Sequence, residues 1–518
     1  MSSPLLPDKT DSKLTTTVPP APAGSASSEL APSVLLEDTL EVPRAVGAIA
    51  AGLVLFGGMA LLLNLFGPAR MIDAGWSLVI LALGMSGLLF HAAFDHEIQF
   101  RRLYMVVALV LLGVGILLTF VPYPKTMGQQ LPWAIPMLLL GVLFFLCFTR
   151  HEDDPLLRDT IERVFGIAGA LFALVGFGVS LFAEAFFLPM GFVLALMGLV
   201  YGVAFITTRS NSDDVAYYGS LGLAAFGLVI ALLVLARSLF TSTGGTFFVG
   251  SGFVMLLVTL IYMVTGLVMG LDTTFCVLLR RELSSFFLSP MAYLSLFTFA
   301  VLAWLSFVFF VSTIYGNIAP EPVLRFYVIS YLPVFGQLFI VPVLTMRLLS
   351  EEKRTGTLEV LLTAPVDEPI VVLAKFFAAL LTYLLVWVPF GLVLLAIPAV
   401  GAPLFDYRPI LSFSVALVVT GSMFISMGLF CSSLSDSQIG AGVLTFIGMV
   451  LLTLIFFFTD EMVVGATLAP IMKHISFMDT WRTAMTGRVV LREYLFPLSA
   501  TVLFLFMTVK VLESRKWS

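Results

Sequence analysis

Residues 103–121 read LYMVVALVLLGVGILLTFV, a run of nineteen residues without a charged side chain, directly after Arg101 and Arg102. About 20 apolar helical residues cross the hydrocarbon core of a bilayer, so this run predicts a transmembrane helix. Such runs recur along the chain, in which hydrophobic residues reach 59% and charged residues only 11%. A soluble protein of this composition would expose large apolar patches. The sequence therefore predicts an integral membrane protein.

The apolar runs predict an all-α, polytopic fold with about fourteen transmembrane helices. They form a group of eight and a group of six. The eight lie near 45–67, 75–95, 103–121, 131–149, 165–187, 190–207, 215–236 and 247–270, and the six near 292–314, 326–348, 370–397, 409–431, 440–459 and 491–512.

Basic residues predict the orientation of these helices, because cytoplasmic connections are enriched in Lys and Arg. With both termini cytoplasmic, the inner connections contain Arg101, Arg102, Arg150, Arg158, Arg163, Arg209, Arg280, Arg281, Lys353 and Arg354. The outer turns of the first group contain only Arg70, Lys125 and Arg237. We therefore expect a multi-pass protein of the cytoplasmic (inner) membrane.

Composition divides the chain into four parts. Residues 1–44 are rich in Pro, Ser, Thr and Ala and predict a disordered cytoplasmic tail. Residues 45–270 hold the first eight predicted helices, an accessory membrane domain, and residues 291–518 hold the other six. Residues 271–290 combine an apolar stripe with a charged one, which includes Arg280, Arg281 and Glu282, and predict an amphipathic helix on the inner surface.

Several kinds of chemistry have no counterpart in the sequence. The net charge of −5 and the absence of a basic cluster argue against a nucleic-acid partner. No GxxxxGK[ST], HExxH or GxSxG motif is present, and the three cysteines lie far apart in the sequence. We therefore expect no catalytic, cofactor-binding or metal-binding residue in this chain.

Ionisable residues near the predicted spans keep another class of function open. His91 and Asp95 lie one helical turn apart, and Glu184 precedes a turn at Pro189. Intramembrane charges often mark ion pathways, so these residues would serve an ion- or proton-coupled secondary transporter. The alternative is that they mark the interfacial ends of helices. A membrane scaffold without transport activity is a third hypothesis.

Two stretches of the second half carry a family resemblance. Residues 346–366 read MRLLSEEKRTGTLEVLLTAPV, and residues 432–439 read SSLSDSQI. They resemble the MRxxxEExRxGTxExLLTxP signature and the SSLTxNQI turn of ABC-2 type transporter permeases, with Ser437 in place of the usual Asn. The resemblance covers residues 273–518 and is nearest to the branch of the gliding-motility permease. Ala374, before Lys375, replaces the usual Gly.

The resemblance implies a permease subunit of an ATP-driven ABC-2 type exporter. ATP and Mg²⁺ would bind to a separate P-loop ATPase subunit, not to this chain. The implied partners are that ATPase, a second copy or a sibling permease, an auxiliary envelope protein and the lipid bilayer. Residues 460–490 look like the short re-entrant or surface helices that the family places at its outer gate.

The loop after the second helix of the group of six is the predicted contact with the ATPase. We expect Leu358, Leu361 and Leu362 to form an apolar face that enters a groove on the ATPase. The carboxylates of the loop are expected to pair with its own basic residues and with Arg280 or Arg281, which ties the loop to the amphipathic helix. Gly356 is expected to break a helix and Pro365 to end it. A solvated inner loop is the alternative. The predicted site comprises Arg347, Glu351, Glu352, Lys353, Arg354, Gly356, Thr357, Glu359, Leu361, Leu362 and Pro365 of the loop, Arg280, Arg281 and Glu282 of the amphipathic helix, and Ser433, Ser435 and Gln438 of the second stretch.

Overall fold

The structure is a computed structural model, and all of its regular elements are helices. It describes residues 32–66, 74–94, 98–120, 131–150, 155–183, 186–208, 213–240, 252–314, 323–328, 332–358, 366–399, 408–456, 465 and 467–516. Within these ranges there is no strand. This confirms the prediction of an all-α polytopic fold.

The chain divides into two compact units, Met1–Arg101 and Arg102–Ser518. The sequence instead predicted a boundary near residue 271. In the structure α9 (Gly252–Gly270) contacts α10 (Thr274–Leu288), and η1 (Phe187–Gly191) contacts α16 (Glu368–Ala399). Helices from both sides of the predicted boundary thus pack against one another, because each has apolar surface to bury.

The first unit consists mainly of two helices that pack closely. The first helix, α1 (Pro32–Phe66), begins inside the predicted tail, so residues 32–44 are helical, and residues 1–31 lie outside the described ranges. It packs against α2 (Ala74–Phe94). A Cβ atom on Gly84 would lie 2.7 Å from the backbone nitrogen of Val54, so the missing side chain lets the two backbones approach. The boundary between the units falls in α3 (Ile98–Phe120).

The first half of the second unit is built from pairs of packed helices. Its elements are α4 (Leu131–Arg150), α5 (Pro155–Phe182), η1, α7 (Phe192–Thr208), α8 (Asp213–Phe240) and α9. α5 packs against α7, and α8 against α9. Phe177, Phe187 and Tyr262 are buried between these pairs, and the Tyr262 hydroxyl donates a 2.6 Å hydrogen bond to the carbonyl of Ala195. This hydrogen bond joins α9 to α7.

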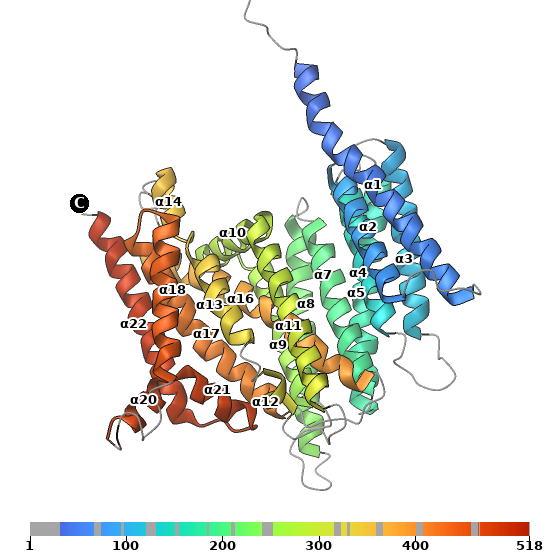
Figure 1. The fold of residues 1–518 in the computed structure, drawn as a ribbon. Coiled ribbons are helices and arrows are strands. Elements are labelled where there is room, and N and C mark those ends of the chain that lie inside the picture. The colour runs from blue at the N-terminus through green and yellow to red at the C-terminus, as the bar shows by residue number, and fades with distance from the viewer. Residues whose placement is uncertain are drawn as a thin grey trace, which may run out of the picture. The chain divides into compact units, whose positions relative to one another are not determined.

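The rest of the second unit surrounds one large core of apolar and aromatic side chains. Its elements are α10, α11 (Pro290–Ile314), α12 (Val323–Val328), α13 (Leu332–Thr345), α14 (Ser350–Thr355), α16, α17 (Arg408–Leu434), α18 (Gln438–Ile455), α20 (Ala469–Ile475), α21 (Phe477–Met485) and α22 (Leu491–Lys516). Figure 1 shows α14 at one end of this bundle, and α20 and α21 at the other. The predicted gate segment, residues 460–490, thus contains two short helices.

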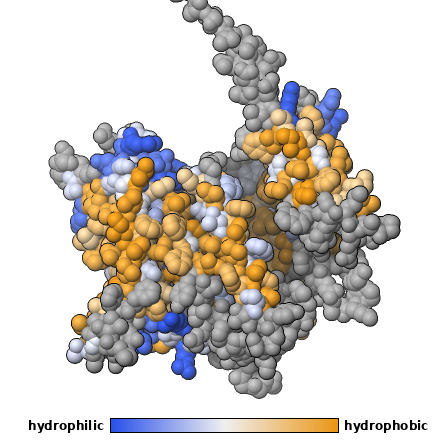
Figure 2. Space-filling model, viewed as in Figure 1, coloured by the Kyte–Doolittle hydropathy of each residue, from blue (hydrophilic) through white to orange (hydrophobic). Residues whose placement is uncertain are grey.

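In the part of the chain that the structure describes, nine helices are long and apolar enough to cross a membrane, or ten if the bent pair α9 and α10 counts as one span. Four shorter apolar helices lie at Ile80–Ala93, Arg102–Leu118, Ala134–Thr149 and Phe192–Thr208. The total of fourteen spans stays a prediction. On the second unit, Figure 2 shows a broad apolar surface with hydrophilic surface towards α14 and towards α21.

Candidate functional site

The helix α10 turns sharply away from the span that precedes it. Its axis is bent by 104° from that of α9, and Thr273 caps its first turn by accepting a hydrogen bond from the amide of Cys276. Leu279 and Phe286 are buried on its apolar side. Arg280 donates to the carbonyl of Met269 at 2.8 Å and to Asp272 at 3.0 Å. Residues 274–288 thus form a helix with a buried apolar side, and Arg280 stabilises the bend in front of it; the position of this helix on the inner surface stays a prediction.

The short helix α14 is capped by a side chain from a distant part of the chain. Ser432, on α17, accepts hydrogen bonds from the amides of Leu349 and Ser350, both at 3.1 Å, and donates to the carbonyl of Met346 at 3.2 Å. The residue at the N-cap position, Leu349, has no side chain able to accept these amides. Ser432 therefore fixes the start of α14 to α17.

Lys353 ties α14 to the turn between α17 and α18. Its side chain is only 3% exposed, and its Nζ donates to the carbonyls of Ser433 and, at 3.4 Å, Ser435. The Asp436 carboxylate lies 3.7 Å from the same nitrogen. A cation is well placed here, because the last carbonyls of a helix lack partners within the helix.

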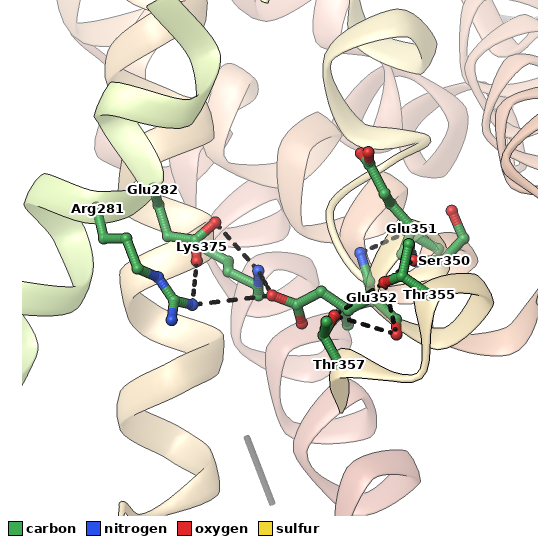
Figure 3. A network of polar contacts seen from close by, with 10 residues as sticks. Arg281, Glu282, Ser350, Glu351, Glu352, Thr355, Thr357 and Lys375 are labelled. Carbon is green, nitrogen blue, oxygen red and sulfur yellow. Dashed lines mark hydrogen bonds and ion pairs between the residues drawn. The ribbon is translucent and has the colours of Figure 1, made fainter. Parts of the chain in front are cut away.

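A buried lysine joins α14 to α10 and α16, as Figure 3 shows. Lys375 of α16, 2% exposed, donates to Glu352 Oε1 at 2.7 Å and to Glu282 Oε2 at 3.1 Å. Arg281 completes the network, at 2.9 Å from Glu282 and 3.9 Å from Glu352. The two positive and two negative charges of this network thus cancel. A buried ammonium group needs such partners, because an unpaired charge in the interior is costly.

The ionised form of Glu282 is favoured by this network. Burial alone would raise the pKa of Glu282, but the charge of Lys375 and the hydrogen bonds from Arg281 and Lys375 outweigh burial, so the pKa is lowered from its ordinary value. Glu282 therefore stays a carboxylate at neutral pH and accepts the hydrogen bond from Lys375.

Arg347 supplies a further contact with α10. Its Nη1 donates to the Ser289 hydroxyl at 2.5 Å and its Nη2 to the Ser285 carbonyl at 3.4 Å, while the guanidinium carbon lies 5.1 Å from the centre of the Phe286 ring. We call the contacts that join α14 and the preceding turn to α10, α16 and the α17–α18 turn the α14 junction.

Other side chains on α14 and the neighbouring turn face the solvent. Glu351, Arg354, Thr355 and Thr357 are exposed on and just after α14. The helix ends at Gly356, whose φ of 72° lies in the left-handed region that favours glycine. Beside the neighbouring turn, Leu434 is 50% exposed and Ile439 77% exposed. An apolar pair thus lies next to a charged helix.

Some of the predicted contacts are confirmed and others are wrong. Gly356 does end a helix. Leu358, expected to face the ATPase, is 5% exposed and part of the chain's own core, because the chain turns inward after Gly356. Glu352 lies 3.9 Å from Arg281 of the amphipathic helix, one of its expected partners, and also pairs with Lys375, which the sequence did not predict. Glu359, Leu361, Leu362 and Pro365 lie outside the described residues.

Of the residues predicted in the second stretch, Ser433 and Ser435 contact α14 through their backbone. Ser433 and Ser435 offer their carbonyls to Lys353, while the Ser433 hydroxyl donates within its own helix to Phe430 at 2.7 Å. Gln438 is the first residue of α18, and Ser437 caps that helix by accepting from the amide of Gly440. Ser437 thus performs locally the capping role for which Asn is also suited.

The sequence reasoning missed Lys375 and Ser432 as parts of the site. Lys375 carried a signal, because it is a lone charged residue near the start of the apolar run 370–397. Ser432 carried none that distinguishes it from Ser433 beside it. Its role depends on a contact between residues more than 80 positions apart.

Of the three residues predicted for a proton-coupled pathway, the structure describes only His91. His91 is 3% exposed and packs edge-on against Phe100, with ring centres 5.0 Å apart. Asp95 and Glu184 lie outside the described residues. Within the described ranges, no group of three or more His, Cys, Asp or Glu side chains could hold a metal ion.

A comparison with family models identifies one domain. Residues 311–479, about a third of the chain, match the model described as ABC-2 family transporter protein. The matched range runs from the end of α11 into α21 and includes α14, Lys375 and Ser432. No curated protein and no solved structure matches the chain. The predicted resemblance is therefore confirmed at the level of this family domain.

Proposed function

We propose that this protein is the permease subunit of an ATP-driven ABC-2 type exporter in the cytoplasmic membrane. The observation that carries the proposal is the α14 junction, which joins a short surface helix to α10, α16 and α17 and whose α14, α16 and α17 residues lie inside the matched domain. A membrane subunit driven by a separate ATPase needs such a stiff element on its surface. The gliding-motility branch remains part of the proposal.

The ATPase contacts the exposed surface of α14 and of the neighbouring turn. Leu434 and Ile439 supply apolar area, and Glu351 and Arg354 supply charges of both signs. Such a combination of apolar anchors and polar rim is typical of protein interfaces. Leu434 and Ile439 take the anchoring role that the sequence suggested for Leu358.

The buried network passes the movement of α14 on to the membrane helices. A displacement of α14 pulls on α16 through Glu352 and Lys375, and on α17 through Ser432. Coupling of this kind requires an element with two arrangements that the bound nucleotide favours unequally. We expect the ion pairs of Lys375 with Glu282 and Glu352 to differ between these two arrangements.

The proposal also covers cofactors and partners. ATP and Mg²⁺ bind to the ATPase subunit, because this chain has no phosphate-binding loop in its sequence. A second copy of the chain, or a sibling permease, completes the transport pathway, and an auxiliary envelope protein joins the complex. Both termini are cytoplasmic.

The test is affinity capture of the full-length chain from its native membranes. We expect a protein with a GxxxxGK[ST] motif to copurify with the chain, ATP hydrolysis by the complex, and none by the purified chain. Hydrolysis by the chain alone would contradict the proposal. Transport driven by a pH gradient in vesicles without ATP would favour the secondary-transporter hypothesis.

A matched pair of variants tests the coupling step separately. Glu352→Gln keeps the shape of the side chain and removes the charge that meets Lys375, whereas Glu513→Gln removes an exposed charge near the end of α22. We expect the first variant to bind the ATPase but to lose transport-linked hydrolysis, and the second to keep both. If Glu352→Gln keeps full transport-linked hydrolysis, the network around Lys375 has only a structural role.

A further inference from the structure

The end of the second unit opposite α14 carries an excess of exposed positive charge. In the described part of residues 465–493, the four exposed charged side chains are all basic: Lys473, Arg482, Arg488 and Arg492. The two acidic side chains there, Asp479 and Glu493, are half-buried, and Glu493 accepts a 3.4 Å hydrogen bond from Thr483. We call these four residues the basic surface. Figure 2 shows hydrophilic surface in this region.

Two arginines of the basic surface lie where membrane helices end. The Arg482 guanidinium carbon is 4.3 Å from the centre of the Phe456 ring, just after α18, and Arg492 is in the first turn of α22. From Arg492 to Lys510, α22 rises roughly 27 Å at about 1.5 Å per residue. A hydrocarbon core is about 30 Å thick, so the spacing places Arg492 at one boundary of the core and Lys510 at the other. Arg492 thus lies at the level of lipid headgroups.

Exposed apolar side chains alternate with these charges. Val489 is 57% exposed and Leu491 76% exposed, between Arg488 and Arg492, and Ile471 of α20 is 53% exposed. At the level of the headgroups, exposed apolar side chains beside basic ones reach the acyl chains while the charged groups stay among the headgroups. The combination is characteristic of a surface that lies in the membrane interface.

We propose that the basic surface binds the phosphate headgroups of anionic phospholipids in the adjacent leaflet. A guanidinium group presents paired N–H donors that match two phosphate oxygens, so the arginines fit this ligand well. The contact of Arg482 with Phe456 and of Glu493 with Thr483 links α18, α21 and α22. Bound lipid therefore braces the short helices against two spans. The proposal is independent of the ATPase.

The test compares two lipids with the same acyl chains but different headgroup charge. Fluorescent phosphatidylglycerol and phosphatidylcholine are titrated into the full-length protein in a neutral detergent. We expect the protein to prefer phosphatidylglycerol by about tenfold or more, since each basic residue near an anionic surface contributes roughly a fivefold preference. Equal affinity for the two lipids would overturn the proposal.

Variants locate the binding site. Arg488→Gln with Arg492→Gln should lower the preference by up to about 25-fold, towards that of phosphatidylcholine, because two such contributions are lost. The control is Arg354→Gln, an exposed arginine at the opposite end, which should leave the preference unchanged. The paired Arg→Lys variant keeps the charge and should retain part of the preference. An unchanged preference in the double Gln variant would overturn the assignment.

Competition separates a lipid surface from a soluble anion. Inorganic phosphate at millimolar concentration should not displace phosphatidylglycerol, because it offers nothing to Val489 and Leu491. Displacement by phosphate alone, with loss in the double Gln variant, would show a site for a soluble anion and contradict the lipid proposal.

Discussion

The ammonium group of Lys375 on α16 lies 2.7 Å from a carboxylate oxygen of Glu352 on α14, and only 2% of the lysine side chain is exposed. These residues lie 23 positions apart in the sequence. A helix on the surface of the protein is therefore bonded directly to the interior of a membrane helix.

Replacing Lys375 by Met should lower the free energy of unfolding by ~3–5 kcal/mol, since breaking a buried pair leaves uncompensated charge. Glu282 and Glu352 would then share only Arg281. Unfolding by SDS in mixed micelles measures the effect. Lys473→Met removes an exposed lysine and should change the free energy by less than about 0.5 kcal/mol. Similar values for both variants would contradict the role of Lys375.

The lowered pKa of Glu282 predicts that the free energy of unfolding depends on pH. Because its folded-state pKa is lowered, the carboxylate stabilises the folded protein above its ordinary pKa of about 4.5, and this contribution is lost as the pH falls through the lowered value. Glu282→Gln should therefore be less stable than the unmodified protein at pH 7, with the difference shrinking below about pH 4.

The same unfolding titration, repeated across this pH range, checks the prediction. Glu351→Gln is the control, because that carboxylate is exposed on α14. It should show little difference from the unmodified protein at any pH. A difference for Glu282→Gln that persists undiminished at acidic pH would mean that the charge of Glu282 is irrelevant.

Ser432 and Ser433 form a matched pair, since both are fully buried but only Ser432 bonds to the turn before α14. Ser432→Ala leaves two amides without their acceptor and should cost about 1–2 kcal/mol. Hydrogen exchange at the amides of Leu349 and Ser350 should become faster in this variant. Ser433→Ala should leave that exchange unchanged, and equal rates in the two variants would remove the capping role.

Cysteine labelling tests which end of the second unit faces the cytoplasm. In a background without Cys147, Cys276 and Cys431, a membrane-impermeant maleimide should label Thr486→Cys in intact cells. It should label Ser437→Cys only after the membrane is permeabilised. Both positions are exposed and lie at opposite ends of α18 and its neighbours. The reverse labelling pattern would invert the proposed orientation and remove α14 from the ATPase's side.

The sequence predicted the features that depend on local patterns. Apolar runs located the helices, the mixed stripe at 271–290 located α10, and Gly356 located the end of α14. Each is a property of a few neighbouring residues. The start of α1 at Pro32 was missed, because a proline in the first turn of a helix reads in the sequence like one in a disordered tail.

The long-range contacts of the site could not be predicted in the same way. The sequence offered Arg280, Arg281 and Arg354 as partners of Glu352, and the fold brings Arg281 and the unexpected Lys375 to it. Leu358 had the spacing of an exposed anchor, yet it faces the core once the chain has turned at Gly356. Choosing among equivalent partners requires the packing of α10, α14 and α16, which no local pattern contains.

We expect a separate ATPase to bind the surface formed by α14 and the α17–α18 turn. The measurement is the Kd of the copurified ATPase for the full-length chain in nanodiscs, compared with Leu434→Asp plus Ile439→Asp. Burying a Leu or Ile side chain contributes about 1.5–3 kcal/mol, so the account predicts at least a tenfold higher Kd. The control, Leu468→Asp plus Ile471→Asp, alters exposed residues at the opposite end and should leave the Kd unchanged. An unchanged Kd in the first variant, or an equal rise in both, would contradict the claim.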